Sequence, residues 1–222
     1  MTVRRCAVAA PAELWMVDLS AAQPDDDVGI LSPLEQARAA RFRMPDDRRR
    51  YRAAHAQVRR LLAGKLGCDA AQIRFAVNDG GKPWVRDAGD LHFSLSYAGD
   101  HALVGISTAG AIGVDVERLR PIDDAVDLAR THFSACEMAT VERTPPGPAR
   151  DRTFLQGWTR KEACVKAIGT GLSLDTSGFV SGVDREPRSA TLRAADTSWV
   201  VDVVSVMTTD DLVAALSLAR CG

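Results

Sequence analysis

Two carboxylates lie two residues apart in the segment Ile112-Gly113-Val114-Asp115-Val116-Glu117. The segment is typical of a strand, and side chains alternate along a strand, so Asp115 and Glu117 share one face and the two valines share the other. Neighbouring carboxylates repel each other unless a cation or solvent screens them. A solvated strand edge is the ordinary explanation of such a pair. A cation site is the alternative, which the preceding glycine and the position near the middle of the chain favour.

A second candidate lies in the predicted helix around Trp158-Thr159-Arg160-Lys161-Glu162-Ala163-Cys164-Val165-Lys166. Residues four apart lie on one row of a helix, so Trp158, Glu162 and Lys166 place an acid and a base on the same face beside an indole. A surface salt bridge, worth about 0.2–1 kcal/mol, is the ordinary alternative.

A third candidate combines the turn Gly80-Gly81-Lys82-Pro83 with the strand Phe93-Ser94-Leu95-Ser96-Tyr97. Hydroxyls, a turn glycine and a lysine are groups that can hold phosphate oxygens. Each is common at strand ends, so this signal is weak when taken alone.

The elements that must position these residues occur in a repeated order. In each half of the chain a long helix is ended by glycine and is followed by a strand and a strand pair. In the first half we expect a strand at 13–19, a helix capped by Ser32 with Glu35 at its third position, a helix from Asp46 to Gly67, and strands at 73–77, 91–96 and 102–107. In the second half we expect a helix at 154–168 ended by Gly169 and Gly171, a strand beginning at Phe179-Val180, and a strand pair at 199–207 and 212–219. The segment 144–148 is predicted to be a loop.

Two α/β halves are therefore predicted, joined near Thr108-Ala109-Gly110, with the functional site in the crevice between them. The composition is ordinary for a globular protein: 222 residues, 46% hydrophobic, with a formal net charge of −1. No global field draws such a chain to nucleic acid or membrane, and no apolar run approaches the roughly 18 residues of a membrane span.

The N-terminus lacks the apolar stretch of an export signal. The five cysteines are scattered, with no CxxC pair. This pattern indicates buried thiols in a reducing cytoplasm rather than a zinc site or a disulfide scaffold.

Taken together, the segments resemble the Sfp-type 4'-phosphopantetheinyl transferases over about residues 37–218. The matching segments are, in chain order, Gly81-Lys82-Pro83, Phe93-Ser94-Leu95-Ser96-Tyr97-Ala98, Gly113-Val114-Asp115-Val116-Glu117, Phe133-Ser134-Ala135-Cys136-Glu137, and Trp158 to Lys166 followed by Gly169 to Leu172. Any one motif is weak, but five in the right order are specific. The sequence departs from the family where Tyr97 replaces the usual histidine and Ala98 the second serine.

The resemblance implies the transfer of 4'-phosphopantetheine from coenzyme A to a serine of an acyl, peptidyl or polyketide carrier protein, with release of adenosine 3',5'-bisphosphate. It implies an α+β fold of two similar α/β subdomains, 1–109 and 110–222, in pseudo-twofold arrangement. Each would have an antiparallel sheet and a packed long helix. We expect a monomer with coenzyme A and Mg²⁺ in the crevice, since Mg²⁺ favours carboxylate and phosphate oxygens.

By the same resemblance, Asp115, Glu117 and Glu162 are the metal ligands, and Asp115, Glu162 and Lys166 are the catalytic residues. Lys166 would stabilise or protonate the leaving group, and the base would be Glu162 or a water bound to the cation. The residues expected at coenzyme A are Arg38, Arg49, Arg50, Gly81, Lys82, Pro83, Ser96, Tyr97, Lys161 and Lys166. Because Tyr97 carries no charge, recognition of the 3'-phosphate would depend on the arginines; Glu35 falls where some family members have a lysine.

Carrier proteins present their serine at the start of an acidic helix, so we expect the docking surface at Arg118, Leu119 and Arg120 with the predicted helix 122–133. A solvent-facing turn ended by Pro121 is the alternative. A different function would use the arginine-rich stretch Arg41–Arg60 as a non-catalytic nucleic-acid-binding helix. The neutral net charge, the few aromatic residues and the carboxylate trio argue against it.

Overall fold

The two helices of the first half begin and end where local sequence signals place them. Helix α1 (Pro33–Ala40) starts with the predicted capping box, in which Ser32 and Glu35 satisfy each other's backbone N–H groups. Helix α2 (Pro45–Leu66) ends at Gly67, whose φ of 66° is a conformation that glycine adopts at little cost. The computed structural model describes residues 1–8, 10–22, 27, 29–170, 174–194 and 197–220.

The long helix of the second half, α5 (Pro148–Ile168), begins six residues earlier than predicted, because Pro148 occupies its first turn, where its missing N–H has no cost. It ends at Gly169 with a φ of 72°, as predicted. Residues 171–173, which include the second glycine of that predicted stop, lie outside the described residues.

The strands of the first half form one antiparallel sheet in the order β1 (Thr2–Cys6), β2 (Glu13–Asp18), β6 (His101–Ser107), β5 (His92–Ala98). A separate two-stranded sheet joins β3 (Phe75–Val77) to β4 (Pro83–Val85). The strand pair at β5 and β6 was predicted, whereas β1 and β4 were not.

The second antiparallel sheet has the order β7 (Ile112–Arg118), β10 (Leu212–Ala219), β9 (Thr197–Val206), β8 (Arg188–Ala194). Helices α3 (Ala125–His132) and α4 (Ala135–Arg143) lie between β7 and α5 in the chain. Short 3₁₀ turns occupy 70–72 and 176–178. In the first half, β2 precedes the helices and pairs with β6, the second strand of the β5–β6 hairpin. In the second half, β7 precedes the helices and pairs with β10, the second strand of the β9–β10 hairpin. The order β2-β6-β5 therefore corresponds to the order β7-β10-β9. The predicted repeat of a long helix, a glycine stop and a hairpin is present in both halves, whereas the strand predicted between glycine and hairpin is present only in the first, as β3.

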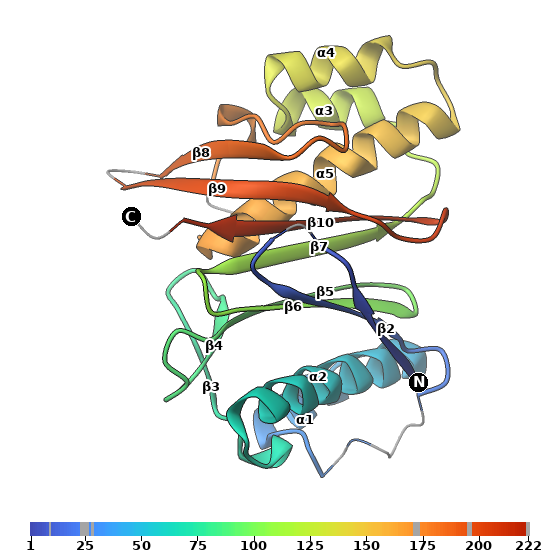
Figure 1. The fold of residues 1–222 in the computed structure, drawn as a ribbon. Coiled ribbons are helices and arrows are strands. Elements are labelled where there is room, and N and C mark those ends of the chain that lie inside the picture. The colour runs from blue at the N-terminus through green and yellow to red at the C-terminus, as the bar shows by residue number, and fades with distance from the viewer. Residues whose placement is uncertain (9, 23–26, 28, 171–173, 195–196, 221–222) are drawn as a thin grey trace.

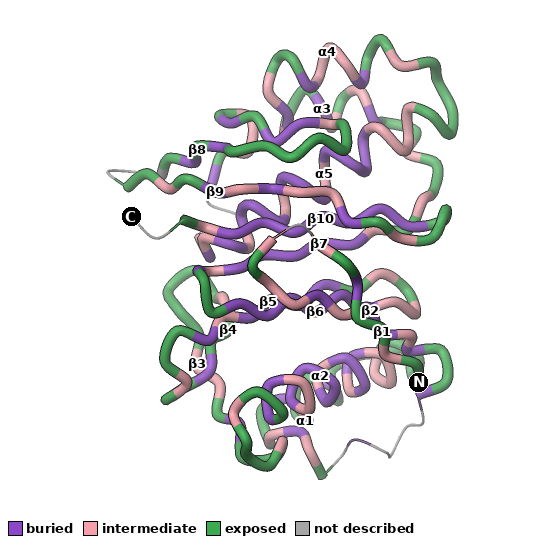
Figure 2. Tube along the Cα trace, viewed as in Figure 1, coloured by how far each residue is buried: buried purple, intermediate pink, exposed green. Residues whose placement is uncertain are grey.

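The layers run from α2 through the first sheet and the second sheet to α5, with α3 and α4 outermost (Figure 1). Buried positions line each contact between layers (Figure 2). The core between α2 and the first sheet includes Val58, Leu62 and Phe93. The core between the two sheets joins Leu14 and Leu103 to the alternate residues of β7 and β10.

The predicted strand at Phe179-Val180 is wrong. The backbone there is held by buried side chains instead of by a neighbouring strand: the Phe179 carbonyl accepts from Lys161, and the Ser181 N–H donates to Glu137 at 2.8 Å. The helix predicted at 122–133 is shorter, at Ala125–His132. Within the described residues, no helix is both long and apolar enough to cross a membrane.

Candidate active site

The acidic face of β7 is turned toward α5, as the alternation of its side chains predicts. Val114 and Val116 are buried in the core between the sheets. Gly113 lies on the opposite face, where a Cβ would come within 2.0 Å of the Ala163 carbonyl oxygen. The absence of a side chain therefore lets α5 lie directly on β7, beside Asp115.

Asp115 is almost fully buried, with 7% of its side chain exposed, and it has a defined set of partners. The Lys166 Nζ lies 2.6 Å from Asp115 Oδ1, and the Ser96 hydroxyl donates to the same oxygen at 2.7 Å. The second oxygen, Oδ2, is buried without a hydrogen-bond partner in the described part of the chain. Leaving a buried carboxylate oxygen unpaired is unfavourable, so this atom has the capacity to bind another group.

The charges of Asp115, Glu117 and Glu162 act on one another. Burial raises the pKa of each of the three carboxyls, and the charge of Asp115 raises the pKa of Glu117 and Glu162 further. Lys166 partly offsets this effect at all three. The predicted row from Trp158 to Lys166 has Glu162 and Lys166 at this site. Trp158 lies instead against α3, edge-on to His132 at 5.4 Å between ring centroids.

The donor set fits a hard divalent cation, because it offers carboxylate oxygens, one of them buried and unpaired. The predicted convergence of the three acids on one divalent ion stays a prediction. In the described ranges, no three His, Cys, Asp or Glu side chains lie close enough together to hold one ion. Lys166 neutralises Asp115, and Arg120 lies 3.3 Å from Glu117, so two of the acids are directed to cationic side chains.

A cleft of about 380 Å³ adjoins this acidic cluster and brings together residues from both halves of the chain. Its predicted members are Arg38, Gly81, Lys82, Pro83, Tyr97, Glu162 and Lys166. The turn before Pro83 forms one side of the cleft. It is held against the end of α5 by a hydrogen bond of 3.2 Å from the Asn78 amide to the Gly169 carbonyl. Tyr51 and His55 also line the cleft, and their rings stack with centroids 4.0 Å apart. Their helical spacing had assigned them only to the packing face of α2.

Lys82 lines the cleft with its hydrocarbon chain and turns its amine inward. The Nζ atom donates to the carbonyl oxygens of Ile112 at 2.9 Å and Ala167 at 2.7 Å. Burial lowers the pKa of this amine to about 8. Lys82 therefore ties the turn at 78–82 to both β7 and α5.

Ser94 and Ser96 join the edge strands of the two sheets and do not form an open phosphate site. The Val114 N–H donates to Ser94 Oγ at 3.1 Å, and the Val116 N–H donates to Ser96 Oγ at 3.4 Å. Both hydroxyls thereby satisfy backbone groups of β7 that an edge strand leaves unpaired. The expected contact of Ser96 with the 3'-phosphate is corrected to a contact with Asp115.

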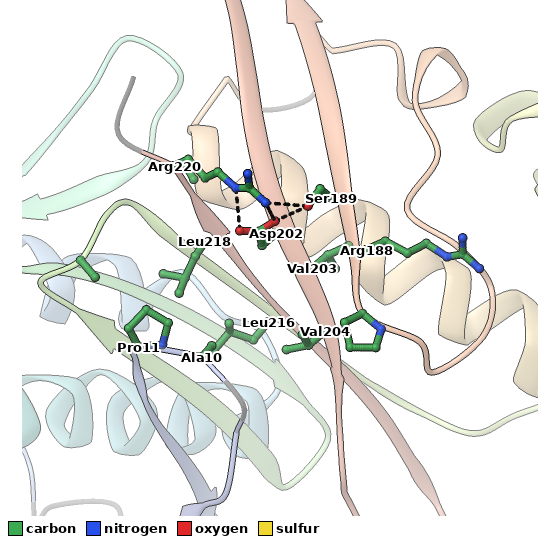
Figure 3. A pocket seen from close by; sticks show the side chains of 13 residues that line it. Ala10, Pro11, Arg188, Ser189, Asp202, Val203, Val204, Leu216, Leu218 and Arg220 are labelled. Carbon is green, nitrogen blue, oxygen red and sulfur yellow. Dashed lines mark hydrogen bonds and ion pairs between the residues drawn. The ribbon is translucent and has the colours of Figure 1, made fainter.

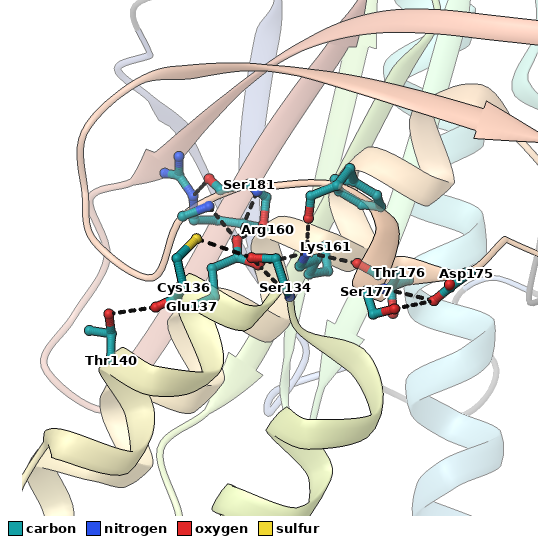
Figure 4. A network of polar contacts seen from close by, with 12 residues as sticks. Ser134, Cys136, Glu137, Thr140, Arg160, Lys161, Asp175, Thr176, Ser177 and Ser181 are labelled. Atoms are coloured by element: carbon teal, nitrogen blue, oxygen red, sulfur yellow. Dashed lines mark hydrogen bonds and ion pairs between the residues drawn. The ribbon is translucent and has the colours of Figure 1, made fainter.

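Lys161 is not brought to the cleft, which corrects the expectation that it binds a phosphate. Its Nζ lies 2.8 Å from Glu137 Oε2, and each of the two side chains is only 2% exposed (Figure 4). It also donates to the Thr176 carbonyl at 2.7 Å. Two of the matched motifs, Phe133 to Glu137 and Trp158 to Lys166, therefore meet in a buried ion pair.

Glu137 is the centre of this buried network. It accepts from the backbone N–H groups of Ser181 at 2.8 Å and Gly182 at 2.7 Å, and from the Ser134 hydroxyl at 2.6 Å. Burial alone would raise the pKa of Glu137, but the Lys161 ammonium and these donors hold it below its usual value. The network fastens α4 and residues 176–182 to α5 (Figure 4).

Of the three arginines expected at coenzyme A, only Arg38 lines the cleft. Arg50 Nε lies 2.8 Å from Asp100, and Arg49 lies 3.3 Å from the same carboxylate. On the same helix, Arg59 is ion-paired with Glu35 and Arg60 with Asp27. These pairs also remove much of the free charge that the alternative of a nucleic-acid-binding helix required.

The residues expected to contact a carrier protein lie at the end of β7, with Arg118 as its last residue. Arg118 and Arg120 are exposed and Leu119 is partly buried, next to Glu117. Nothing in the structure tests their role, which stays a prediction.

A second cavity, of about 390 Å³, lies beside β9 and β10 and holds none of the matched motif residues (Figure 3). Its floor includes Val204, Leu216 and Leu218. Its charged groups are already paired, because Arg220 donates to Asp202 at 2.6 Å and to Ser189 at 2.8 Å, and Arg188 donates to Asp184 at 2.6 Å. The first cleft is therefore the better candidate for chemistry.

The chain as a whole is similar in sequence to known proteins. A family model described as the 4'-phosphopantetheinyl transferase superfamily matches residues 111–217. The chain is 33% identical over 214 residues to the 4'-phosphopantetheinyl transferase HetI of Nostoc sp., covering 94% of this chain and 88% of that protein. It is 33% identical over 184 residues to 4'-phosphopantetheinyl transferase psf-1 of Bacillus pumilus, covering 78% and 77%. It is 28% identical over 161 residues to 4'-phosphopantetheinyl transferase Sfp of Bacillus subtilis, covering 72% and 70%.

Proposed function

The chain belongs to the 4'-phosphopantetheinyl transferase superfamily, and from that premise we propose how its cleft serves the transfer of phosphopantetheine from coenzyme A to a carrier-protein serine. The observation that carries the proposal is a cleft lined by Gly81, Lys82, Pro83, Glu162 and Lys166, in which Lys166 is paired with the buried Asp115 behind the wall. The serine oxygen attacks the phosphorus of the pantetheine phosphate. The bond from that phosphorus to the bridging oxygen breaks, and adenosine 3',5'-bisphosphate leaves.

We propose that Asp115, Glu117 and Glu162 hold a divalent cation, and that this cation is Mg²⁺. The buried, unpaired Oδ2 of Asp115 and the hard oxygen donors support this assignment. When bound, the cation neutralises the charge that develops on the departing phosphate.

The side chains of the cleft supply the remaining chemistry. The Lys166 amine would stabilise the leaving phosphate oxygen or give it a proton. Glu162 would accept the proton of the carrier serine, because its burial and the neighbouring acids raise its pKa toward that of a useful base. Ser96 acts as a positioning residue, since it holds Asp115 through the 2.7 Å hydrogen bond.

The nucleotide of coenzyme A would occupy the rest of the cleft. Gly81 and Pro83 border it, Arg38 supplies a positive charge, and Tyr97 can donate a hydrogen bond. Lys82 would act mainly through the field of its buried charge, because two of its three donors are taken by backbone carbonyls.

The partner would be an acyl, peptidyl or polyketide carrier protein that docks at Arg118, Leu119 and Arg120. These residues adjoin the acidic face of β7, and their positive charge suits an acidic helix. We further propose subdomains 1–109 and 110–222 and a monomer, because both walls of the cleft come from one chain. Free buried thiols at Cys6 and Cys164 support a reducing, cytoplasmic setting.

The test is the intact mass of purified carrier proteins of the three types after incubation with the enzyme, coenzyme A and Mg²⁺, with and without chelator. The proposal predicts a gain of one phosphopantetheine on at least one carrier, which the chelator abolishes. A carrier whose acceptor serine is changed to alanine is the matched control. No gain on any carrier would overturn the proposed function.

A further inference from the structure

The end of the cleft away from the acids is lined by aromatic rings and little free charge. Tyr97, which is 42% exposed, and the partly exposed His55 present ring surface to the cleft, and the buried rings of Tyr51 and Phe93 lie behind them among its lining residues. Aromatic faces of this kind bind a nucleobase by stacking, which needs no charge on the protein.

The basic side chains at this end are engaged by other groups. His55 Nδ1 lies 3.5 Å from Glu35 Oε1, and Arg59 lies 2.7 Å from Glu35 Oε2. Arg59 is only 1% exposed, so the Glu35–Arg59 ion pair is buried behind the cleft wall. The Glu35 carboxylate therefore neutralises the positive charge of Arg59, which would otherwise attract a phosphate bound in the cleft.

The lysines of the cleft are directed elsewhere as well. The Lys82 amine is fixed on the carbonyls of Ile112 and Ala167, and the Lys166 amine lies on Asp115 at the reacting end. Arg49 and Arg50 are held by Asp100 outside the cleft. Among the cleft-lining residues that the structure describes, Arg38 is the cationic side chain that is exposed to solvent and is neither ion-paired nor held by backbone carbonyls.

This inference rests on the proposed function, because the reacting pyrophosphate must lie beside Glu162 and Lys166. The ribose and its 3'-phosphate then extend toward Arg38, Tyr51 and Tyr97. We propose that this protein gains little from the 3'-phosphate, and that it accepts 3'-dephospho-coenzyme A as a substrate nearly as well as coenzyme A. The nucleotide is held mainly by stacking and shape at this end.

The size of the effect follows from the exposure of Arg38. A solvent-exposed ion pair changes an equilibrium by a factor of about five at most, because water screens it and the long side chain loses freedom. The ratio of kcat/KM for coenzyme A to that for 3'-dephospho-coenzyme A should therefore lie below about tenfold.

The test measures both substrates with one carrier protein that the enzyme modifies, by intact mass, using the full chain and Mg²⁺. A ratio below about tenfold supports the proposal, and a larger ratio overturns it. Failure of the proposed function gives a different result, since coenzyme A itself would then produce no modified carrier.

Two variants test which residue accounts for the remaining preference for coenzyme A over 3'-dephospho-coenzyme A. In Arg38→Ala the ratio should fall to about one, because the solvent-exposed cation of the cleft is gone. In Arg41→Ala, an exposed arginine just after α1 that does not line the cleft, the ratio should equal that of the parent protein. A ratio that falls in Arg41→Ala and not in Arg38→Ala would contradict the assignment of Arg38. Both positions are exposed, so both variants are expected to fold, and circular dichroism checks this.

Discussion

Replacing Lys161 by methionine separates a structural role from a role in binding coenzyme A. Lys161 and Glu137 are each only 2% exposed and lie 2.8 Å apart. Removing the amine leaves the Glu137 carboxylate buried without its counter-ion, and breaking a buried pair in this way costs about 3–5 kcal/mol. For a chain of this length the Tm should fall by about 6–20 °C. The backbone donors from Ser181 and Gly182 remain, which favours the lower part of that range.

Urea unfolding and a thermal melt measure the loss of stability, and the KM for coenzyme A is measured where both proteins are fully folded. We expect the free energy of unfolding to fall and the KM to stay within about twofold. The matched control is Lys65→Met, whose exposed pair with Glu13 should contribute no more than about 1 kcal/mol. A Lys161→Met protein of normal stability with a greatly raised KM for coenzyme A would show that Lys161 binds the phosphates and has no structural role.

Three further changes test other parts of the site. Burial lowers the pKa of Lys82 from 10.5 to about 8. Between about pH 8 and pH 10.5 the unfolded chain therefore binds more protons than the folded one. Because of this difference, the contribution of Lys82 to the free energy of unfolding rises with pH. The stability difference between the parent and Lys82→Met should therefore change by about 2–3 kcal/mol in favour of the parent between about pH 7.5 and pH 10, and a constant difference would contradict it. Tyr97→Phe should raise the KM for coenzyme A only about two- to fivefold, since it removes one exposed hydroxyl; complete loss of activity would show a larger role. Arg120→Glu should slow modification of a carrier protein by about tenfold without altering the KM for coenzyme A, and equal damage to both would reject Arg120 as a docking residue.

Local signals in the sequence predict the helices well because each one depends on a few neighbouring atoms. The capping box of Ser32 and Glu35 and the left-handed glycines at 67 and 169 are decided within one helical turn. The alternation of β7 likewise predicts that Asp115 faces away from the core between the sheets.

The side chains that sequence misplaced are those whose partners lie far away in the chain. Lys161 and Glu162 are neighbours on α5, but they point in different directions around the helix, and only the position of Glu137 on α4 decides which one is buried. Tyr51 and His55 fit the apolar spacing of α2 equally well whether they face the core or a cleft. The cleft that they line forms only where the turn at 78–82 contacts Gly169, a residue far away in the chain.

The serines of β5 show the same limit. Ser96 lies in a segment that matches the family pattern, yet its hydroxyl bonds to Asp115 and to the backbone of β7. That role exists only because β5 and β7 are the facing edges of two sheets formed by different halves of the chain.

The central claim is that Asp115 and its acidic neighbours bind one divalent cation. The most direct test is a calorimetric titration of Mn²⁺ into the protein in the presence of coenzyme A, comparing the parent with the isosteric Asp115→Asn variant after both are shown to be folded. We expect one Mn²⁺ site in the parent, with an affinity at least about tenfold weaker in the variant. Equal affinity in the two proteins would contradict it.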